Sequence, residues 1–305
     1  MLPNEKHFSA SHYYLDFSPI EGKGILEINL VKYMELIPQL TEMARNLRIL
    51  ALKIITEAGS GHPGGSLSAA DLITALYFHF LRHDSKVPHW KDRDRFVLSK
   101  GHGAPIVYAA LAKCGYFPEE ELFTLRKINS RLQGHPDHIR LPYMETSSGS
   151  LGQGLSIAQG MAIAAKLNRQ DLKIYCLLGD GELQEGQIWE AAMSAPKYKL
   201  DNLIAIIDAN KGQIDGHTKD VMDLAPLKQK WEAFNWDVQE IDGHNFSEIL
   251  AALDNAQYGR KKPHMIIANT VKGKGVSFME NKIEWHGVAP TPKERDRAIN
   301  ELLKR

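Results

Sequence analysis

The chain has 305 residues, and this length favours one large domain with added elements over a single small core. Lysine plus arginine and aspartate plus glutamate both number 37, so the net charge favours neither nucleic acid nor an anionic membrane as a partner. No stretch of about 18 apolar residues is present to span a bilayer, and the polar segment 1–24 lacks the apolar centre of a secretory signal. The two isolated cysteines exclude a disulfide framework, so we expect a cytoplasmic protein with buried thiols.

The N-terminal residues show no sustained hydrophobic period. Residues 1–36 are therefore expected to form an arm that lies on the body of the protein or on a partner. One domain is expected over residues 37–305. It begins with a predicted helix over 37–58, because apolar residues recur there at helical spacing, Pro38 suits a first turn and Gly59 follows the end.

Two later segments are rich in glycine. Glycine and proline dominate residues 59–66, which are expected to be neither helix nor central strand. Ser68 is expected to cap a helix that ends at Phe80. Residues 126–154 form a long irregular stretch, and a loop of this length inside a compact domain usually serves a function or is disordered.

From Arg95 onward, short apolar runs alternate with segments of helical spacing. This alternation predicts an α/β fold, a doubly wound and mostly parallel sheet with helices on both faces. The predicted strands cover 95–99, 173–178, 202–208, 236–241 and 264–270, and the predicted helices cover 104–113, 155–166, 246–258 and 293–305.

Polar residues follow two of these predicted strands. Asp180 and Asn210 end two runs that one strand-helix-strand crossover separates, so both are expected at the carboxyl edge of the sheet. Their oxygens, with the carbonyl of Gly212, suit magnesium or calcium, and Gly181 lets a phosphate approach the backbone. These residues indicate a metal-bridged diphosphate, although Gly-Asp-Gly also occurs in plain turns.

Histidines stand beside glycines in several predicted loops. Imidazoles donate to phosphate oxygens and transfer protons near neutral pH, so these positions are candidates for chemistry. A single loop histidine is usually a surface residue, and the sequence does not show that these converge. The histidines are His62, His102, His135, His217, His244 and His286.

These motifs, taken in their order along the chain, resemble those of a known enzyme family. Gly179-Asp180-Gly181 with Asn210 resembles the signature of thiamine diphosphate enzymes. The other elements are similar to the N-terminal half of a transketolase, from about residue 40 to about residue 290. They are Ser60-Gly61-His62-Pro63-Gly64, the run from Arg93 to His102, Gly134-His135-Pro136, Leu151-Gly152-Gln153-Gly154, Gly179 to Gly186, Ile214-Asp215-Gly216, Asp242-Gly243-His244-Asn245 and His286-Gly287.

The resemblance implies roles at matching positions. Asp180, Asn210 and the Gly212 carbonyl would hold Mg²⁺ or Ca²⁺ on the cofactor's diphosphate. His62, His135 and His286 would lie around the substrate as catalytic histidines. Those that would bind or adjoin the cofactor are His102, Gly149, Ser150, Leu151, Asp180, Gly181, Glu185, Asn210, Ile214 and His286.

Other matching positions are less specific. Glu185 and Glu190 match acidic residues between the halves of the enzyme. Ile214 and Val271 match residues that pack on the cofactor rings, with ordinary core packing as the alternative. The chain departs from the family at Gly149-Ser150-Leu151, where Gly-Pro-Leu is frequent, and at Gly212, where a bulky apolar residue is frequent.

The sequence ends at Arg305, where the family's pyrimidine-binding domain is expected to begin. In the family that domain carries the glutamate that activates the cofactor. We therefore expect one subunit of a split transketolase, with the pyrimidine-binding and C-terminal domains on a partner chain and two copies of each chain.

The implied reaction moves a two-carbon ketol unit from a ketose phosphate to an aldose phosphate, with thiamine diphosphate as electron sink. One alternative is an enzyme similar to 1-deoxyxylulose-5-phosphate synthase that uses pyruvate. A second is a non-catalytic scaffolding subunit that kept the fold. Neither the preferred sugars nor the role of residues 1–36 follows from the sequence.

Overall fold

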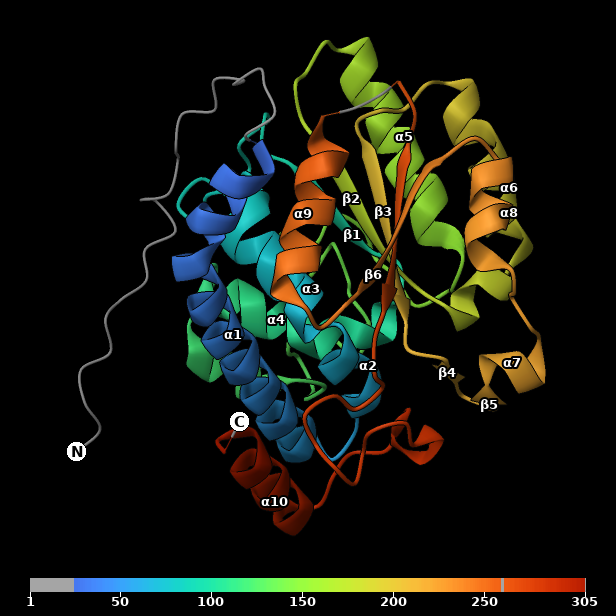
Figure 1. The fold of residues 1–305 in the computed structure, drawn as a ribbon. Coiled ribbons are helices and arrows are strands. Elements are labelled where there is room, and N and C mark those ends of the chain that lie inside the picture. The colour runs from blue at the N-terminus through green and yellow to red at the C-terminus, as the bar shows by residue number, and fades with distance from the viewer. Residues whose placement is uncertain (1–24, 259–260, 305) are drawn as a thin grey trace.

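A five-stranded parallel sheet forms the centre of the computed structural model, which describes residues 25–258 and 261–304 (Figure 1). Every neighbouring pair of strands runs parallel, so all carboxyl ends meet at one edge. This confirms the predicted fold class. The strands, in spatial order, are β1 (Arg95–Leu98), β2 (Ile174–Gly179), β3 (Leu203–Ala209), β7 (His264–Asn269) and β6 (Asp237–Asp242).

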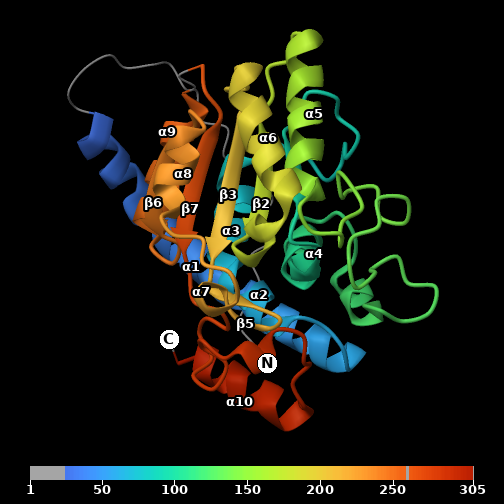
Figure 2. The same ribbon diagram turned by 90° about the vertical axis from the view of Figure 1, so that its right-hand side faces the viewer.

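Helices cover both faces of the sheet (Figures 1 and 2). Alternate residues of each strand enter two separate cores: Tyr175 and Leu177 of β2 face one, and Cys176 and Leu178 face the other. The first core contains α1 (Ile25–Ala58), α3 (Ala70–Ala75), α4 (Ala104–Lys113) and α9 (Phe246–Gln257); the second contains α5 (Gln153–Leu167), α6 (Gly186–Lys197) and α8 (Leu227–Ala233).

Shorter elements complete the described chain. They are α2 (Pro63–Ser68), a π-helical turn (Leu76–Phe80), α7 (Thr218–Val221), α10 (Pro292–Leu302), a hairpin of β4 (Gly212–Gln213) and β5 (Gly216–His217), and the 3-10 turns Gly101–Gly103, Glu119–Thr124, Gly181–Gln184 and Ile283–Trp285. The C-terminal helix α10 packs Ala298 and Leu302 against Leu52 of α1 and Leu67 of α2 in a small third core. A capping box between Thr291 and Glu294 starts this helix.

The first helix begins earlier than predicted. It starts at Ile25 instead of residue 37, so Pro38 lies inside the helix and not in its first turn. The last residues of the expected arm are therefore helical, and Tyr33 is buried in the first core. The rest of that arm, residues 1–24, lies outside the described residues, so the expected division at residue 36 stays a prediction.

The glycine-rich segment also differs from expectation. Residues 63–68 form α2, with Pro63 at its start, and Ser68 ends this helix instead of capping the next. The glycines serve close packing: a Cβ at Gly64 would lie 2.9 Å from the Trp285 carbonyl oxygen, and one at Gly65 would lie 3.3 Å from the His102 ring. Glycine here allows helices to approach, which outweighs its low helix propensity.

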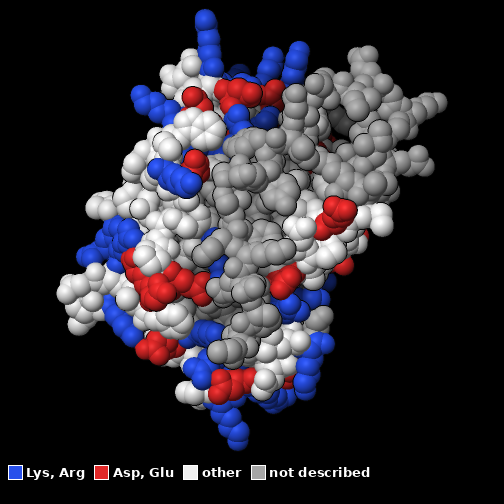
Figure 3. Space-filling model, turned by 90° about the vertical axis from the view of Figure 1, so that its left-hand side faces the viewer, with Lys and Arg blue, Asp and Glu red and all other residues white. Residues whose placement is uncertain are grey.

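Other predictions agree with the structure. Residues 126–152 contain neither helix nor strand, as expected for the long irregular stretch. In the described part of the chain, no helix has the length and apolar character needed to cross a bilayer. The face in Figure 3 carries lysine and arginine interspersed with aspartate and glutamate, with no broad area of one sign.

Candidate active site

The carboxyl ends of β2 and β3 bring Asp180 close to the residues after Asn210. Gly179 pairs with Asp208 in the strand register, so the turns after these two strands are neighbours. The Asp180 carboxylate accepts the N–H groups of Gly181, at 2.8 Å, and of Lys211. Burial, followed by the nearby Asp208, raises the pKa of Asp180 to about 6. A cation would stabilise the charged form of this buried carboxylate, so Asp180 is suited to bind one.

The Asn210 amide has a fixed orientation. Its Nδ2 donates to Asp208 Oδ2 at 3.1 Å and to Ser68 Oγ at 3.3 Å, and its Oδ1 accepts the Gly212 N–H at 3.1 Å. Oδ1 therefore lies on the Gly212 side. Asp180, Asn210 and the Gly212 carbonyl form a set of oxygen donors that fits Mg²⁺ or Ca²⁺.

Asp208 joins several buried side chains beneath this edge of the sheet. It was not predicted as a site residue from the sequence. Its carboxylate is fully buried and pairs with the Lys100 ammonium, which is fully buried too. Ser68 Oγ at 2.6 Å and Thr270 Oγ1 also donate to it. Burial pushes the pKa of Asp208 up, but Lys100 and the hydroxyls of Ser68 and Thr270 together outweigh burial and lower the pKa. A carboxylate inside an otherwise apolar strand was the available sequence signal.

Lys272 is a second buried cation that sequence reasoning missed. Its ammonium lies 3.2 Å from the Gly212 carbonyl oxygen and 3.1 Å from His286 Nδ1, and the residue is 1% exposed. Burial, followed by repulsion from Lys100, lowers the pKa of Lys272 to about 8. A buried ammonium held by a carbonyl and an imidazole is suited to an anion.

Four of the predicted histidines converge above this edge. Ring centroids of His62 lie 5.4 Å from His102, 5.9 Å from His135 and 5.5 Å from His286, and His102 lies 5.2 Å from His286. Burial, then neighbouring cations and rings, lowers the pKa of His62 to about 4 and that of His286 to about 3. The rings of these two are thus neutral at pH 7.

Arg126 lies beside this histidine cluster. Burial, then the Arg126 guanidinium, lowers the pKa of both His62 and His135. Within the described residues, Arg126 Nε and His62 Nδ1 are buried polar atoms without a hydrogen-bond partner. Unsatisfied groups of this kind beside a cluster of imidazoles fit a polar ligand that binds there.

The loop of residues 126–152 is tied to the sheet edge at several points. Glu182, 2% exposed, accepts the N–H groups of Gly152 and Gly179, both at 2.9 Å, and the Ser99 hydroxyl. Gly149 has φ of 142°, and a Cβ there would lie 3.3 Å from the His135 ring. Gly149 therefore packs against His135, whereas Ser150 is exposed and Leu151 is partly buried.

Some predicted site residues do not contact this cluster. Ile214 is 70% exposed at the tip of the β4–β5 hairpin, and Glu185 and Glu190 have exposed side chains. Gly181 makes close contact with Gln213, where a Cβ would lie 2.9 Å from that side chain. His217 is partly buried and pairs with the Lys211 carbonyl instead of joining the four histidines.

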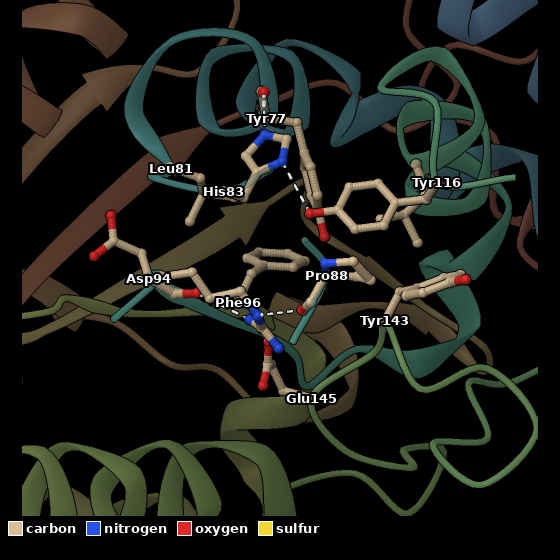
Figure 4. Close-up of a pocket in the computed structure, with 11 residues that line it drawn as sticks. Tyr77, Leu81, His83, Pro88, Asp94, Phe96, Tyr116, Tyr143 and Glu145 are labelled. Atoms are coloured by element: carbon tan, nitrogen blue, oxygen red, sulfur yellow. Dashed lines mark hydrogen bonds and ion pairs between the residues drawn. The ribbon is translucent and has the colours of Figure 1, made fainter. Parts of the chain in front are cut away.

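A second pocket involves none of the predicted site residues (Figure 4). Its polar groups pair among themselves: His83 Nδ1 lies 3.0 Å from the Tyr116 hydroxyl, and Arg93 pairs with Glu145. The second pair anchors the loop of residues 126–152 to the segment before β1. The pocket therefore supports the loop, and we assign it no chemistry.

The sequence pattern described as "Transketolase, thiamine diphosphate binding domain" matches residues 40–301. This chain belongs to the transketolase family. The transketolase fold is also found by structural comparison: the transketolase of Leishmania mexicana superposes with a TM-score of 0.82 at 32% identity, over 86% of this chain and 41% of that chain. The transketolase of Campylobacter jejuni gives 0.81 at 36% identity, over 87% and 43%.

Two kinds of relative differ in length. The 6-deoxy-6-sulfo-D-fructose transketolase subunit SqwG of Clostridium sp. is 49% identical over 87% of this chain and 96% of its own length. An apulose-4-phosphate transketolase subunit of Phocaeicola vulgatus is 45% identical over 83% of this chain and 90% of its own. Human transketolase is 46% identical over 86% of this chain but only 42% of its own. The chain thus corresponds to the N-terminal, thiamine-diphosphate-binding part of a transketolase, as predicted, and two of these relatives are named as transketolase subunits.

Proposed function

We propose that this chain is the cofactor-binding half of a two-subunit transketolase that moves a two-carbon ketol unit from a ketose phosphate to an aldose phosphate. The observation that carries the proposal is the meeting of four histidines, a buried lysine and a buried carboxylate at one sheet edge. Bound thiamine diphosphate supplies the electron sink for breaking and forming the carbon–carbon bond.

The residues of this chain divide between the cofactor's diphosphate and the substrate. Asp180, Asn210 and the Gly212 carbonyl would hold Mg²⁺ or Ca²⁺ against the diphosphate. Lys272 and His102 would donate to its oxygens. Two observations support this fit. A bound cation would lower the raised pKa of the Asp180 carboxyl, and a bound anion would stabilise the charged form of the buried Lys272 ammonium.

His62, His135 and His286 are proposed to act on the substrate. Neutral imidazoles donate one hydrogen bond and accept another, so they orient hydroxyl groups and accept or return a proton. Burial, followed by the Arg126 charge, lowers the pKa values of His62 and His135 and so favours their neutral state. Gly149, Ser150 and Leu151 are proposed to back the cofactor's pyrimidine ring, and Ile214 and Val271 to pack on its rings.

A partner chain is proposed to complete the site. The names of the subunit relatives and the fraction of human transketolase that this chain covers support this proposal. The partner would supply the glutamate that contacts the pyrimidine and the binding site for the substrate's anionic end. A shallow groove between α5 and α6, which includes Ser156, Gln159 and Glu190, is open for such docking. Two copies of each chain are the proposed assembly.

The test is reconstitution with a candidate pyrimidine-binding subunit from the same organism. We expect the chain alone to bind thiamine diphosphate weakly and to transfer no ketol units, and the partner to restore both. Calorimetry measures binding, and a coupled assay compares xylulose 5-phosphate, 6-deoxy-6-sulfofructose and pyruvate as donors. Full turnover by the single chain would refute the two-subunit proposal. Pyruvate turnover would favour the synthase alternative, and a complex that never binds the cofactor would favour a scaffold.

A further inference from the structure

The Asp242-Gly243-His244-Asn245 motif has a defined geometry but no place in the proposed function so far. The Asp242 carboxylate accepts the His244 N–H at 2.8 Å, and the Asn245 side chain caps α9 by accepting the Ser247 N–H at 3.0 Å. A Cβ at Gly243 would lie 2.5 Å from Thr270 Cγ2. Three of the four residues thus build a tight turn against the end of β7, and this turn aims the His244 ring inward.

The His244 ring joins two segments far apart in the sequence. Its Nε2 lies 2.8 Å from the Val271 backbone nitrogen, and its Nδ1 lies 2.7 Å from Asp71 Oδ2. Because a backbone N–H only donates, Nε2 accepts and Nδ1 carries the hydrogen that Asp71 receives. These two contacts define the tautomer and the ring orientation of His244.

Asp71 is itself held in place. Arg48 donates to both of its carboxylate oxygens, at 2.9 and 2.6 Å, and also to the Leu67 carbonyl oxygen at 3.2 Å. The side chains of Arg48, Asp71 and His244 are between 7% and 8% exposed. The chain of contacts therefore runs from α1 through α3 to the turn before α9, inside the protein.

The far end of this chain of contacts leads to the proposed diphosphate site. Val271 precedes Lys272, whose ammonium lies 3.2 Å from the Gly212 carbonyl oxygen and 3.1 Å from His286 Nδ1. The orientation of the Val271 peptide determines where the Lys272 side chain starts. A shift there of about 1 Å would remove a hydrogen bond at the ammonium, because such bonds are short and directional.

We propose that His244, held by Asp71 and Arg48, is a positioning residue that fixes the Val271 peptide and thereby the Lys272 ammonium at the diphosphate end of the site. This inference rests on the proposed function. In this proposal His244 contacts neither cofactor nor substrate. The other three residues of the turn stabilise the turn itself, and His244 is the one that holds the Val271 peptide.

Two substitutions separate the two contacts of the ring. In His244→Gln the longer side chain places an amide oxygen near the position of Nε2, so the contact with Val271 is retained and that with Asp71 is lost. In His244→Asn the shorter side chain places its amide near Nδ1, so the contact with Asp71 is retained and that with Val271 is lost. Both substitutions replace the ring by an amide, and the two amides differ by one methylene group.

The experiment measures dissociation constants of the reconstituted complex for thiamine diphosphate and for unphosphorylated thiamine, both with Mg²⁺. We expect His244→Asn to weaken thiamine diphosphate at least tenfold and His244→Gln less than threefold, with thiamine affinity unchanged in both. Hydrogen exchange of the Val271 amide should accelerate only in His244→Asn. His83→Asn, at a partly buried histidine outside the site, serves as control and should lower stability without changing either affinity.

Equal losses in the two variants, or a parallel loss of thiamine affinity, would overturn the positioning role. Unchanged exchange at Val271 in His244→Asn would overturn it as well. A wild-type complex that binds no thiamine diphosphate would instead overturn the proposed function, and the assigned task of Lys272 with it. The exchange measurement would then still show whether His244 fixes the Val271 peptide.

Discussion

Asp180 is a buried carboxylate that accepts two backbone N–H groups, and no ammonium forms an ion pair with it within the described chain. Asp208 differs from Asp180, because it is buried more fully but forms an ion pair with Lys100. Asp180 directly follows β2 and Asp208 lies in the neighbouring strand β3, and the two have opposite pKa shifts. One is suited to an external cation, and the other has its cation within the fold.

Replacing Asp180 by alanine should remove metal-dependent cofactor binding and leave the fold intact. The affinity of the reconstituted complex for thiamine diphosphate with Mg²⁺ is expected to fall at least a hundredfold, measured by calorimetry. The unfolding midpoint of the ligand-free chain should not fall, because burial and Asp208 raise the pKa of this carboxyl to about 6 and its charge is costly there.

Asp201→Ala is the matched control, since that carboxylate forms a partly exposed pair with Lys166. It should leave cofactor affinity unchanged. An Asp180→Ala complex with wild-type affinity would remove Asp180 from the metal site.

Arg126 should control the acid limb of activity. Burial and the Arg126 charge hold the pKa of His62 at about 4, so the neutral ring persists until the pH falls near that value. Arg126→Met removes the charge and raises the pKa of His62 and of His135. Because the neutral form is active, activity should then be lost at higher pH, and the acid limb of kcat/KM should move upward.

The measurement is a profile of kcat/KM from pH 3.5 to pH 8 on the reconstituted complex. Lys127→Met is the control, since that lysine pairs with Glu57 at the surface. An acid limb that stays in place in Arg126→Met would show that the guanidinium does not set the protonation of these rings.

At the scale of elements, two glycines in helices have opposite surroundings. A Cβ at Gly64 in α2 would collide with the Trp285 carbonyl oxygen at 2.9 Å, whereas a Cβ at Gly160 in α5 would meet nothing within 4 Å. Gly160→Ala should therefore stabilise the isolated chain by up to about 1 kcal/mol through helix propensity. Gly64→Ala should destabilise it and weaken cofactor binding, because Trp285 and His286 must move.

Urea unfolding of the isolated chain measures the first effect, and calorimetry of the reconstituted complex measures the second. Gains of stability in both variants would mean that α2 has room for a side chain, contrary to the packing described above.

Helices and strands were predicted accurately where the local sequence pattern is strong. The strands, α4 and α9 were predicted to within about two residues, because continuous apolar runs and helical spacing identify them. The start of α1 and the helicity of 63–68 were missed. In both cases proline or glycine, which usually end helices, is accommodated by tertiary packing that local propensity does not contain.

The same reasoning applies to the site. Asp180, Asn210 and the histidines stand in glycine-flanked motifs, and so they were recognised before the structure showed that four of the rings converge. Lys272, Glu182 and the role of Asp208 were missed. The importance of these residues depends on their burial and on partners distant in sequence. Neither property produces a residue spacing that can be recognised in the sequence.

At the scale of the whole molecule, the two cores share one sheet and should open together. Cys114 lies in the first core and Cys176 in the second, and burial raises the pKa of both thiols. Cys114→Ser and Cys176→Ser each leave a single reporter. We expect both thiols to label with a disulfide reagent only at the rate of global unfolding, so the two rates should agree within about threefold.

Labelling after denaturation provides the control for intrinsic thiol reactivity. A Cys114 thiol that reacts much faster than Cys176 in the native chain would show that the layer of α1, α3, α4 and α9 detaches from the sheet independently.

The meeting of His62 and His286 also constrains how the protein is made. These rings stand near opposite ends of the chain, and the segments between them include all five strands of the central sheet. During synthesis the first core can begin to form while the site still lacks its last histidine and Lys272. Such long-range contacts form late. A nascent chain in which Lys272 and His286 are still inside the ribosome should therefore be unable to bind the cofactor, even after the first core has begun to form.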